Sequence, residues 1–204
     1  MRRVLIQFAH PVLERSRVNR HLIEAVQALD GVTVNDLYEV YPDLSIDVKR
    51  EQTLLDDHDV IVFQHPFYWY TGPAILKEWQ DLVLEHGWAY GQGGEHLEGK
   101  LTLNAISAGA PKTAYRTDGY NRFTIRQLLA PWHQTAHLCG MHYLGPFVVF
   151  GALQIAEHND MHVSADAYRS LIEALRDDRI DLERAIASED LQEDLPQLLR
   201  KAVA

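Results

Sequence analysis

The sequence predicts an α/β protein in which helices cover both faces of a doubly wound, five-stranded parallel sheet. Buried strands alternate with amphipathic helices along the chain, which is the pattern that parallel strands and crossover helices produce. Five strands within about 150 residues fit the strand order 2-1-3-4-5 better than a six-stranded sheet.

The first half of the chain is expected to supply three strands. Residues 4–9 are a near-continuous apolar run, typical of a strand buried on both faces, and residues 32–37 alternate as a shorter strand. Between them, apolar side chains spaced by three and four residues predict an amphipathic helix over residues 17–29. A short helix near residues 51–55 precedes a third buried strand at residues 59–64.

The second half continues the alternation of strands and helices. An amphipathic helix over residues 73–86 and a glycine-rich loop lead to a fourth strand at residues 100–107. A helix over residues 123–138, interrupted by Pro131, precedes a fifth strand at residues 141–150.

We expect a single domain, because no repeat, low-complexity segment or linker interrupts the 204 residues. Its core is expected at about residues 3–175, where an amphipathic helix over residues 165–175 completes the pattern. Residues 176–204 are expected to form a peripheral helical tail.

Composition excludes several other classes of protein. Apolar residues make up 47% of the chain, too many for a disordered protein, and their longest runs are too short to span a bilayer. A net charge of -10 without a basic patch argues against nucleic-acid binding. The single cysteine, Cys139, and the lack of a signal-peptide pattern predict a cytoplasmic protein. The histidines are scattered, so we expect no metal site.

The most informative stretch is residues 64–73, which carry the aromatic run Phe67, Tyr68, Trp69 and Tyr70. These side chains follow a buried strand at its carboxyl end, where open α/β sheets bind ligands. Because aromatic side chains pack well against rings, we expect a planar heterocycle here. A core or dimer-interface role for Trp69 and Tyr70 is the alternative. The neighbouring histidine, residue 65, is expected to satisfy a buried backbone carbonyl.

The loop after the first strand is a candidate phosphate site. Ser16 is a good N-cap for the helix at residues 17–29, and a helix N-terminus offers free N–H groups and partial positive charge. His10, Arg17 and Asn19 add side-chain donors. The loop contains neither G-x-G-x-x-G nor G-x-x-x-x-G-K-[ST], so a monophosphate held without metal fits best. The simpler alternative is that Ser16 only caps the helix.

Several separate motifs, in order, resemble those of the flavodoxin-like NAD(P)H:quinone oxidoreductases. They are His10-Pro11, Ser16 to Asn19, Gln64-His65-Pro66, Trp69-Tyr70 and Leu76-Lys77-Glu78-Trp79. Further segments are similar to the branch that contains the ancillary proteins of glutathione-gated potassium efflux systems. They are Tyr38, Tyr41-Pro42-Asp43, Ile46-Asp47, Glu51-Gln52 and His86 to Gly91. The resemblance covers about residues 3 to 150.

The resemblance implies a flavodoxin-like fold and noncovalently bound FMN or FAD, with FMN favoured by the compact phosphate loop. It also implies two-electron transfer from NAD(P)H to a quinone, and a homodimer with its sites at the interface. Carried over by position, the flavin-binding residues are His10, Ser16, Arg17, Val18 and Asn19 at the phosphate, Phe67, Tyr68, Trp69 and Tyr70 at the ring edge, and Ser107, Ala108, Gly109 and Ala110 with their backbone amides toward the ring.

Tyr115 matches a family tyrosine near the flavin C2 carbonyl and is the expected catalytic residue. Two departures from the family pattern affect this site. The segment from Ser107 to Ala110 replaces T-T-G-G, and the Cβ of Ala110 can crowd a close approach. Asn121 stands where the best-known diaphorases have a histidine, which leaves Tyr115 to act alone or with water.

Two other functions are weighed against the enzyme. One is a regulatory ancillary subunit that contacts a membrane potassium efflux antiporter at its cytoplasmic face, with redox turnover secondary. The other is a one-electron flavodoxin, against which His10-Pro11 and Trp69-Tyr70 argue, because flavodoxins typically carry a Thr/Ser-rich phosphate loop with glycine.

Overall fold

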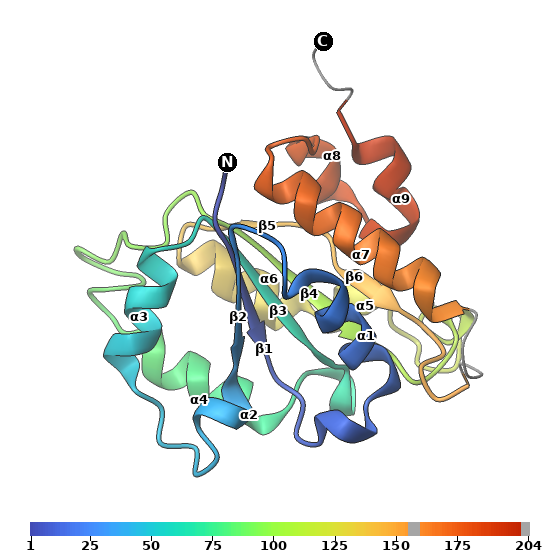
Figure 1. Ribbon diagram of the computed structural model, residues 1–204, viewed down its shortest axis with the longest axis horizontal. Coiled ribbons are helices and arrows are strands. Elements are labelled where there is room, and N and C mark those ends of the chain that lie inside the picture. Colours follow the sequence, from blue (N-terminus) through green and yellow to red (C-terminus); the bar gives the residue numbers. More distant parts are fainter. Residues whose placement is uncertain (155–159, 201–204) are drawn as a thin grey trace.

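A computed structural model describes residues 1–154 and 160–200 (Figure 1). Its centre is a parallel sheet in the order β2-β1-β3-β4-β5, with β6 also paired to β4, and this confirms the predicted order. The strands are β1 (Val4–Phe8), β2 (Val32–Asp36), β3 (Val60–Pro66), β4 (Leu101–Ser107), β5 (His142–Tyr143) and β6 (Phe147–Val149). Strands β1, β3 and β4 are buried along their whole length, which explains their near-continuous apolar sequences.

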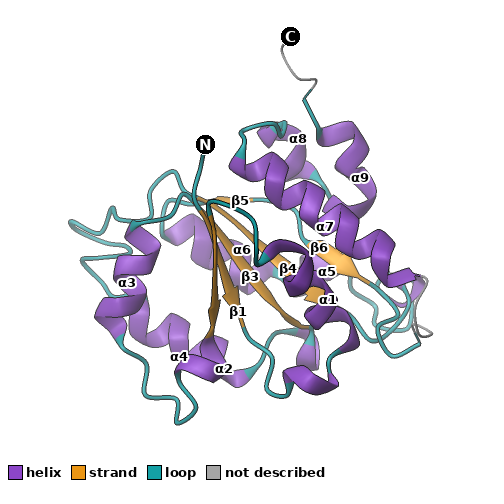
Figure 2. Ribbon diagram, in the orientation of Figure 1, coloured by secondary structure: helices purple, strands orange, loops and turns teal. Residues whose placement is uncertain are grey.

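Helices cover both faces of this sheet (Figure 2). The helices are α1 (Arg17–Val26), α2 (Leu37–Val40), α3 (Val48–Asp56), α4 (Ala74–Val83), α5 (Ile125–Leu128), α6 (Ala130–Leu138), α7 (Asp160–Arg176), α8 (Leu182–Ala187) and α9 (Leu191–Leu198). Buried side chains of α1, α7, α8 and α9 form one hydrophobic core with one face of the sheet. Those of α3, α4 and α6 form a second core on the other face. None of the helices in the described ranges combines the length and apolar character needed to cross a membrane.

The predicted fifth strand is wrong in one respect, because residues 141–150 form two short strands instead of one. Between β5 and β6, the N–H of Gly145 donates to the carbonyl of Ala185, and Pro146 has no N–H to offer the ladder. A Cβ on Gly145 would lie 2.3 Å from the carbonyl oxygen of Ser188, so only glycine fits this approach of two backbones. The break is therefore set by the segment that leads into α9.

Three other elements differ from prediction. The helix expected over residues 123–138 is broken at Leu129, and Pro131 lies in the first turn of α6, where its missing N–H costs nothing. Pro73 is the N-cap of α4 and lies just outside that helix. The short helix α2 was not expected, and Asp36 caps it by accepting from the N–H groups of Tyr38 and Glu39.

The described part of the tail, residues 177–200, is largely helical as expected, but it is not peripheral. Leu191, Leu195 and Leu198 project from α9 into the core that β1 and β4 share with α1. Their spacing of three and four residues makes α9 amphipathic, and burying each leucine stabilises the fold by about 1.5–3 kcal/mol. The core therefore extends well past residue 175.

A buried carboxylate joins the sheet to the helices of the second core. Glu51, with no exposed surface, accepts hydrogen bonds from the side chains of Gln7 (2.9 Å), Asn35 (2.9 Å), Tyr41 (2.7 Å) and Trp79 (2.8 Å), and it pairs with the neighbouring arginine, residue 50. A buried charge is tolerated only when donors surround it. Burial, and then the bond to Glu51, raises the pKa of Tyr41 to about 12. The network ties β1, β2, α3 and α4 together.

We predict that Trp79→Phe lowers the free energy of unfolding by about 2 kcal/mol, since it removes one donor from the buried charge and keeps most of the ring. Chemical denaturation measures this change. Trp88→Phe, in the glycine-rich loop where the indole stacks on His96, is the matched control. An unfolding free energy unaltered by Trp79→Phe would show that Glu51 does not need this donor.

Candidate active site at the carboxyl ends of the strands

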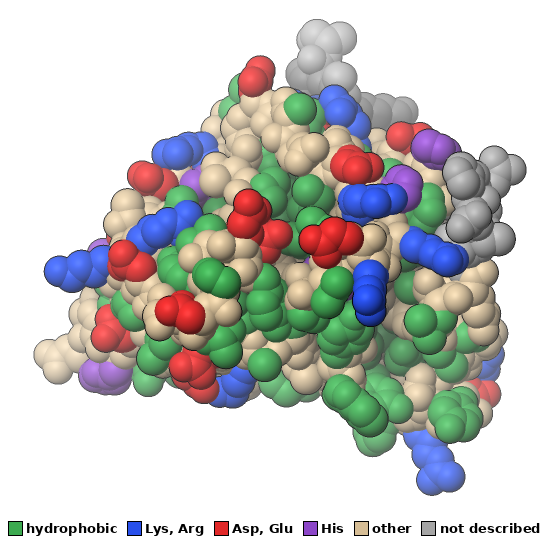
Figure 3. Space-filling model, turned by 60° about the horizontal axis from the view of Figure 1, so that its bottom comes forward, with side chains coloured by type: hydrophobic (Ala, Val, Ile, Leu, Met, Phe, Trp, Pro, Cys, Tyr) green, Lys and Arg blue, Asp and Glu red, His purple; other side chains and the backbone are tan. Residues whose placement is uncertain are grey.

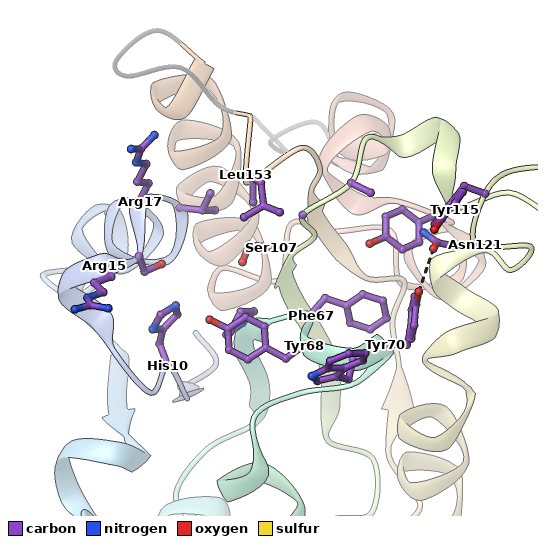
Figure 4. Close-up of a pocket in the computed structure, with 18 residues that line it drawn as sticks. His10, Arg15, Arg17, Phe67, Tyr68, Tyr70, Ser107, Tyr115, Asn121 and Leu153 are labelled. Carbon is purple, nitrogen blue, oxygen red and sulfur yellow. Dashed lines mark hydrogen bonds between the residues drawn. The ribbon is translucent and has the colours of Figure 1, made fainter.

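A cleft of about 750 Å³ opens where β1, β3 and β4 end (Figure 4). Among the residues predicted for the site, those that line it are His10, Ser16, Arg17, Val18, Phe67, Tyr68, Trp69, Tyr70, Ser107, Gly109, Ala110 and Tyr115. Asn19 and Ala108 do not line it. Hydrophobic side chains gather on this face of the molecule (Figure 3). In the described part of the chain, no group of His, Cys, Asp and Glu side chains is arranged to hold a metal ion.

One end of the cleft is the N-terminus of α1. Ser16 caps this helix, and its hydroxyl accepts the N–H of Asn19 at 3.1 Å. The first N–H groups of a helix have no partner within the helix, so those of Arg17 and Val18 are left for a ligand in the cleft. The guanidinium groups of Arg15 and Arg17 project from the same segment (Figure 4). This end of the cleft therefore suits an anion.

Asn19 was expected to donate to a ligand, but its side chain forms a hydrogen bond within the protein instead. It is buried, its side-chain amide donates to the hydroxyl of Ser107 at 2.9 Å, and its carbonyl accepts from the side chain of Gln64 at 3.2 Å. Asn19 thus anchors α1 to the ends of β3 and β4. Ala108 differs for a similar reason: it is fully buried, and its N–H donates to the carbonyl of Val149 in the sheet.

His10 lies at the same end of the cleft and is uncharged. Its Nδ1 accepts the N–H of Val12 at 3.1 Å, which leaves the proton on Nε2. Burial lowers the pKa of His10, so the imidazole is neutral at physiological pH. Its ring meets Tyr68 edge-on, with 6.2 Å between the ring centres (Figure 4). His10 therefore offers a ligand one hydrogen-bond donor and no charge.

The aromatic turn, residues 67–70, is strained and exposed. Trp69 (φ 51°) and Tyr70 (φ 64°) adopt the left-handed conformation, which costs roughly 1–2 kcal/mol for each residue with a Cβ. The Trp69 side chain gains little burial in return, because it is 91% exposed. Strain and exposure together are typical of surfaces that contact a ligand or partner. Trp69 is therefore not a core residue.

His65 packs against this turn and supports it. It has no exposed surface, its Nδ1–H donates to the carbonyl of Pro66 at 3.0 Å, and its Nε2 accepts from the amide of Asn104 at 3.1 Å. This confirms the expected bond to a buried carbonyl. The far end of the turn returns over the same ring, since a Cβ on Gly72 would lie 3.1 Å from Nδ1. Burial lowers the pKa of His65 to about 4.

The opposite wall follows β4. A Cβ on Gly109 would lie 3.0 Å from Cδ1 of Leu153, so this position has little room for a side chain. The N–H of Gly151 donates to the carbonyl of Ala110 at 3.0 Å, which brings Ala152 and Leu153 over the cleft. Ala110 lines the cleft with its Cβ in place.

Tyr115 completes this wall. Its ring centre lies 6.2 Å from that of Phe67 and 5.8 Å from that of Phe150. Burial raises the pKa of Tyr115, so its hydroxyl keeps its proton at neutral pH. Asn121, at the place of the family histidine, accepts from the hydroxyl of Tyr70 at 3.3 Å (Figure 4). Asn121 therefore links the Tyr115 side of the cleft to the aromatic turn.

Some lining residues were not predicted from the sequence. They are Arg15, Pro66, Tyr120, Ala152 and Leu153, whereas Asn121 was already noted at the family histidine position. Arg15 and Pro66 are direct neighbours of predicted residues, so extending each motif by one position finds them. Leu153 is brought to the cleft by the backbone hydrogen bond from Gly151 to Ala110, which no local sequence pattern predicts.

Comparison with known proteins agrees with this architecture. Residues 2–172 match a family model described as having a flavodoxin-like fold. The chain belongs to this flavodoxin-like family. The resemblance to its quinone reductases and efflux ancillary proteins is confirmed by the relatives that follow.

The relatives of this flavodoxin-like chain include both kinds of protein. The glutathione-regulated potassium-efflux system ancillary protein KefG of Serratia proteamaculans is 51% identical over 150 residues, covering 74% of this chain and 82% of KefG. General stress protein 14 of Treponema denticola, solved in complex with FMN, has a TM-score of 0.79 and 40% identity, covering 85% and 99% of the two chains. An NADPH-quinone reductase from P. pentosaceus has a TM-score of 0.75 and 31% identity, covering 83% and 96%.

We predict that His65→Gln flattens the pH dependence of stability between pH 6.5 and 4. In this window the unfolded state binds a proton on His65 and the native state does not, so wild-type stability is lost as pH falls. The slope of unfolding free energy against pH should fall by about 1.4 kcal/mol per pH unit, the value for one proton. Urea denaturation across this range measures it, with His137→Gln, at an exposed position of α6, as the matched substitution. Equal slopes for wild type and His65→Gln would contradict the prediction.

Proposed function

We propose that the protein is an FMN-dependent NAD(P)H:quinone oxidoreductase of the cytoplasm. The observation that carries the proposal is one cleft with two different ends: a helix N-terminus suited to phosphate, and an exposed aromatic turn suited to a planar ring. Membership of the flavodoxin-like family supports it, as does the FMN complex of general stress protein 14 at 40% identity.

The donors in the cleft fit FMN better than FAD. The phosphate would be held by the N–H groups of Arg17 and Val18, the hydroxyl of Ser16 and the Nε2–H of His10. These donors converge on one short segment, as a single phosphate requires. The guanidinium of Arg15 adds positive charge at the same end.

The rest of the cleft would orient the ring and the substrates. Bound FMN supplies reversible two-electron chemistry between NAD(P)H and a quinone. The aromatic turn would pack against the edge of a bound ring, and the wall of Ser107, Gly109 and Ala110 lies across the cleft from it. Tyr115 holds a proton at its hydroxyl at neutral pH and is the proposed hydrogen-bond or proton donor. Asn121 cannot titrate, so it positions Tyr70 and relays no proton.

We predict that the purified protein is yellow, or becomes so with added FMN, and oxidises NADH or NADPH when a quinone is supplied. Flavin absorbance measures binding, and steady-state kinetics with both nucleotides and a set of quinones measures turnover. A colourless protein that takes up neither FMN nor FAD would overturn the proposal. Bound flavin without turnover of any quinone would favour the second function that follows.

The second candidate is an ancillary subunit of a potassium efflux transporter. The 51% identity to KefG over 150 residues favours it. In either case we propose a homodimer with its clefts at the interface, since the rim exposes Trp69, Tyr120 and Leu153. Light scattering measures the oligomeric state. Co-purification with membranes that carry the transporter, compared with membranes that lack it, separates the two functions.

We predict that Trp69→Gly weakens FMN binding about tenfold, because one ring contact worth roughly 1–1.5 kcal/mol is lost. The same change should leave the fold as stable or more stable, since glycine relieves the left-handed backbone. Fluorescence titration measures the dissociation constant, and denaturation measures stability. Trp88→Gly, in a loop outside the cleft, is the control for binding. Unaltered FMN affinity in Trp69→Gly would show that the indole does not contact the flavin.

A further inference from the structure

We propose that the C-terminal helix α9 positions Tyr115 for the reaction, acting through Lys112. We name residues 108–124, which join β4 to α5, the Tyr115 loop. The inference rests on the proposed function for the reaction itself, but its structural part concerns the chain alone. The family match ends at residue 172, so α9 is an addition to the part of the chain that the family model describes.

Lys112 is held by two carboxylates, one at the N-cap of α9 and one in its first turn. Its Nζ lies 2.5 Å from Glu193 and 3.7 Å from Asp190. Asp190 is only 4% exposed and caps α9 by accepting the N–H of Gln192 at 3.0 Å, so it is a fixed point. The Tyr115 loop is therefore tied at its beginning to a rigid, buried carboxylate.

Aromatic contacts connect this ion pair of Lys112 to the cleft. The ammonium of Lys112 lies over the ring of Phe150, 5.9 Å from its centre. The ring of Phe150 packs against Tyr115 at 5.8 Å, and Tyr115 packs against Phe67 at 6.2 Å. A contiguous row of contacts thus runs from α9 to the aromatic turn, which is the kind of path that transmits position.

The same segment holds the other end of the loop. Arg126, in α5, donates to the carbonyls of Ile186 (2.8 Å) and Ser188, just before α9 begins. The Tyr115 loop is therefore fastened at both ends to residues 186–193. An exposed ion pair alone would contribute little. Here one partner is buried, and removing Lys112 would leave its charge without a counterion.

The environment of Asp190 agrees with a need for this counterion. Burial raises the pKa of Asp190 to about 6. The N–H of Gln192 and the charge of Lys112 act in the opposite direction and lower this pKa. Glu193 also faces it and raises the pKa. Above about pH 6 the carboxylate is charged, and Lys112 is the cation that lies beside it.

The test compares Lys112→Met with Lys112→Arg in the flavin-loaded protein. Amide hydrogen exchange, followed by mass spectrometry, reports the Tyr115 loop directly. We expect Lys112→Met to speed exchange in residues 108–124 about fivefold or more, with exchange in β1 unchanged. Lys112→Arg should restore slow exchange. Arg116→Met is the matched control, because Arg116 lies in the same loop and pairs only locally, with Asp118.

Kinetics then test positioning. Lys112→Met should raise KM for the quinone about fivefold, with a smaller effect on FMN affinity because the phosphate end of the cleft is untouched. If the charge left on Asp190 unfolds the variant, Lys112→Met with Asp190→Asn removes that charge, keeps a good N-cap and should behave as Lys112→Met is expected to.

Unaltered exchange in both Lys112→Met and the double variant would overturn the proposal. Faster exchange with unchanged KM and kcat would overturn the positioning role. A wild-type protein without any quinone turnover would instead overturn the proposed function, while the exchange result would still decide whether α9 braces the loop.

Discussion

The cleft depends on the hydrogen bonds of one buried residue, Asn19. Its side chain holds Ser107 at the end of β4, and its carbonyl holds Gln64 in β3. The in-register pairing of β1, β3 and β4 brings these strand ends together, but a helix packed on one face could still slide along them. Asn19 fixes the position of α1 along the direction of the strands. This position determines how far the anion end of the cleft lies from the aromatic turn.

The site combines neutral polar groups with charge at a single end. Burial keeps His10 and His65 unprotonated and Tyr115 protonated at physiological pH. Positive charge in the cleft comes from Arg15 and Arg17 beside the N-terminus of α1. A ligand with one anionic end and one planar end therefore has a single favourable orientation. The strained turn at Trp69 is held by His65 below it, so local strain is supported by a rigid base.

Much of this could be predicted from the sequence, because it is encoded locally. Buried strands such as residues 60–66 show as apolar runs, and Ser16 shows as a cap. Most of what failed depends on contacts between distant segments, although the short helix α2 has a local cap at Asp36. Asn19 and Ala108 were placed in the right region with the wrong role, since their partners are 88 and 41 residues away, as 107 − 19 and 149 − 108 give. The split of β5 from β6 comes from the contact between the tail and Gly145, and α9 is buried because its leucines pack against the core of β1, β4 and α1.

The break between β5 and β6 has a consequence for aggregation. An edge strand with a long free row of N–H and C=O groups is a template on which another chain can add. Here the edge offers only two short pieces, and the N–H of Leu191 donates to the carbonyl of Pro146 in the gap between them. A growing cross-β stack would find no continuous ladder on this side of the sheet. By interrupting this edge, the C-terminal segment disfavours edge-to-edge pairing on the β5 and β6 side of the sheet.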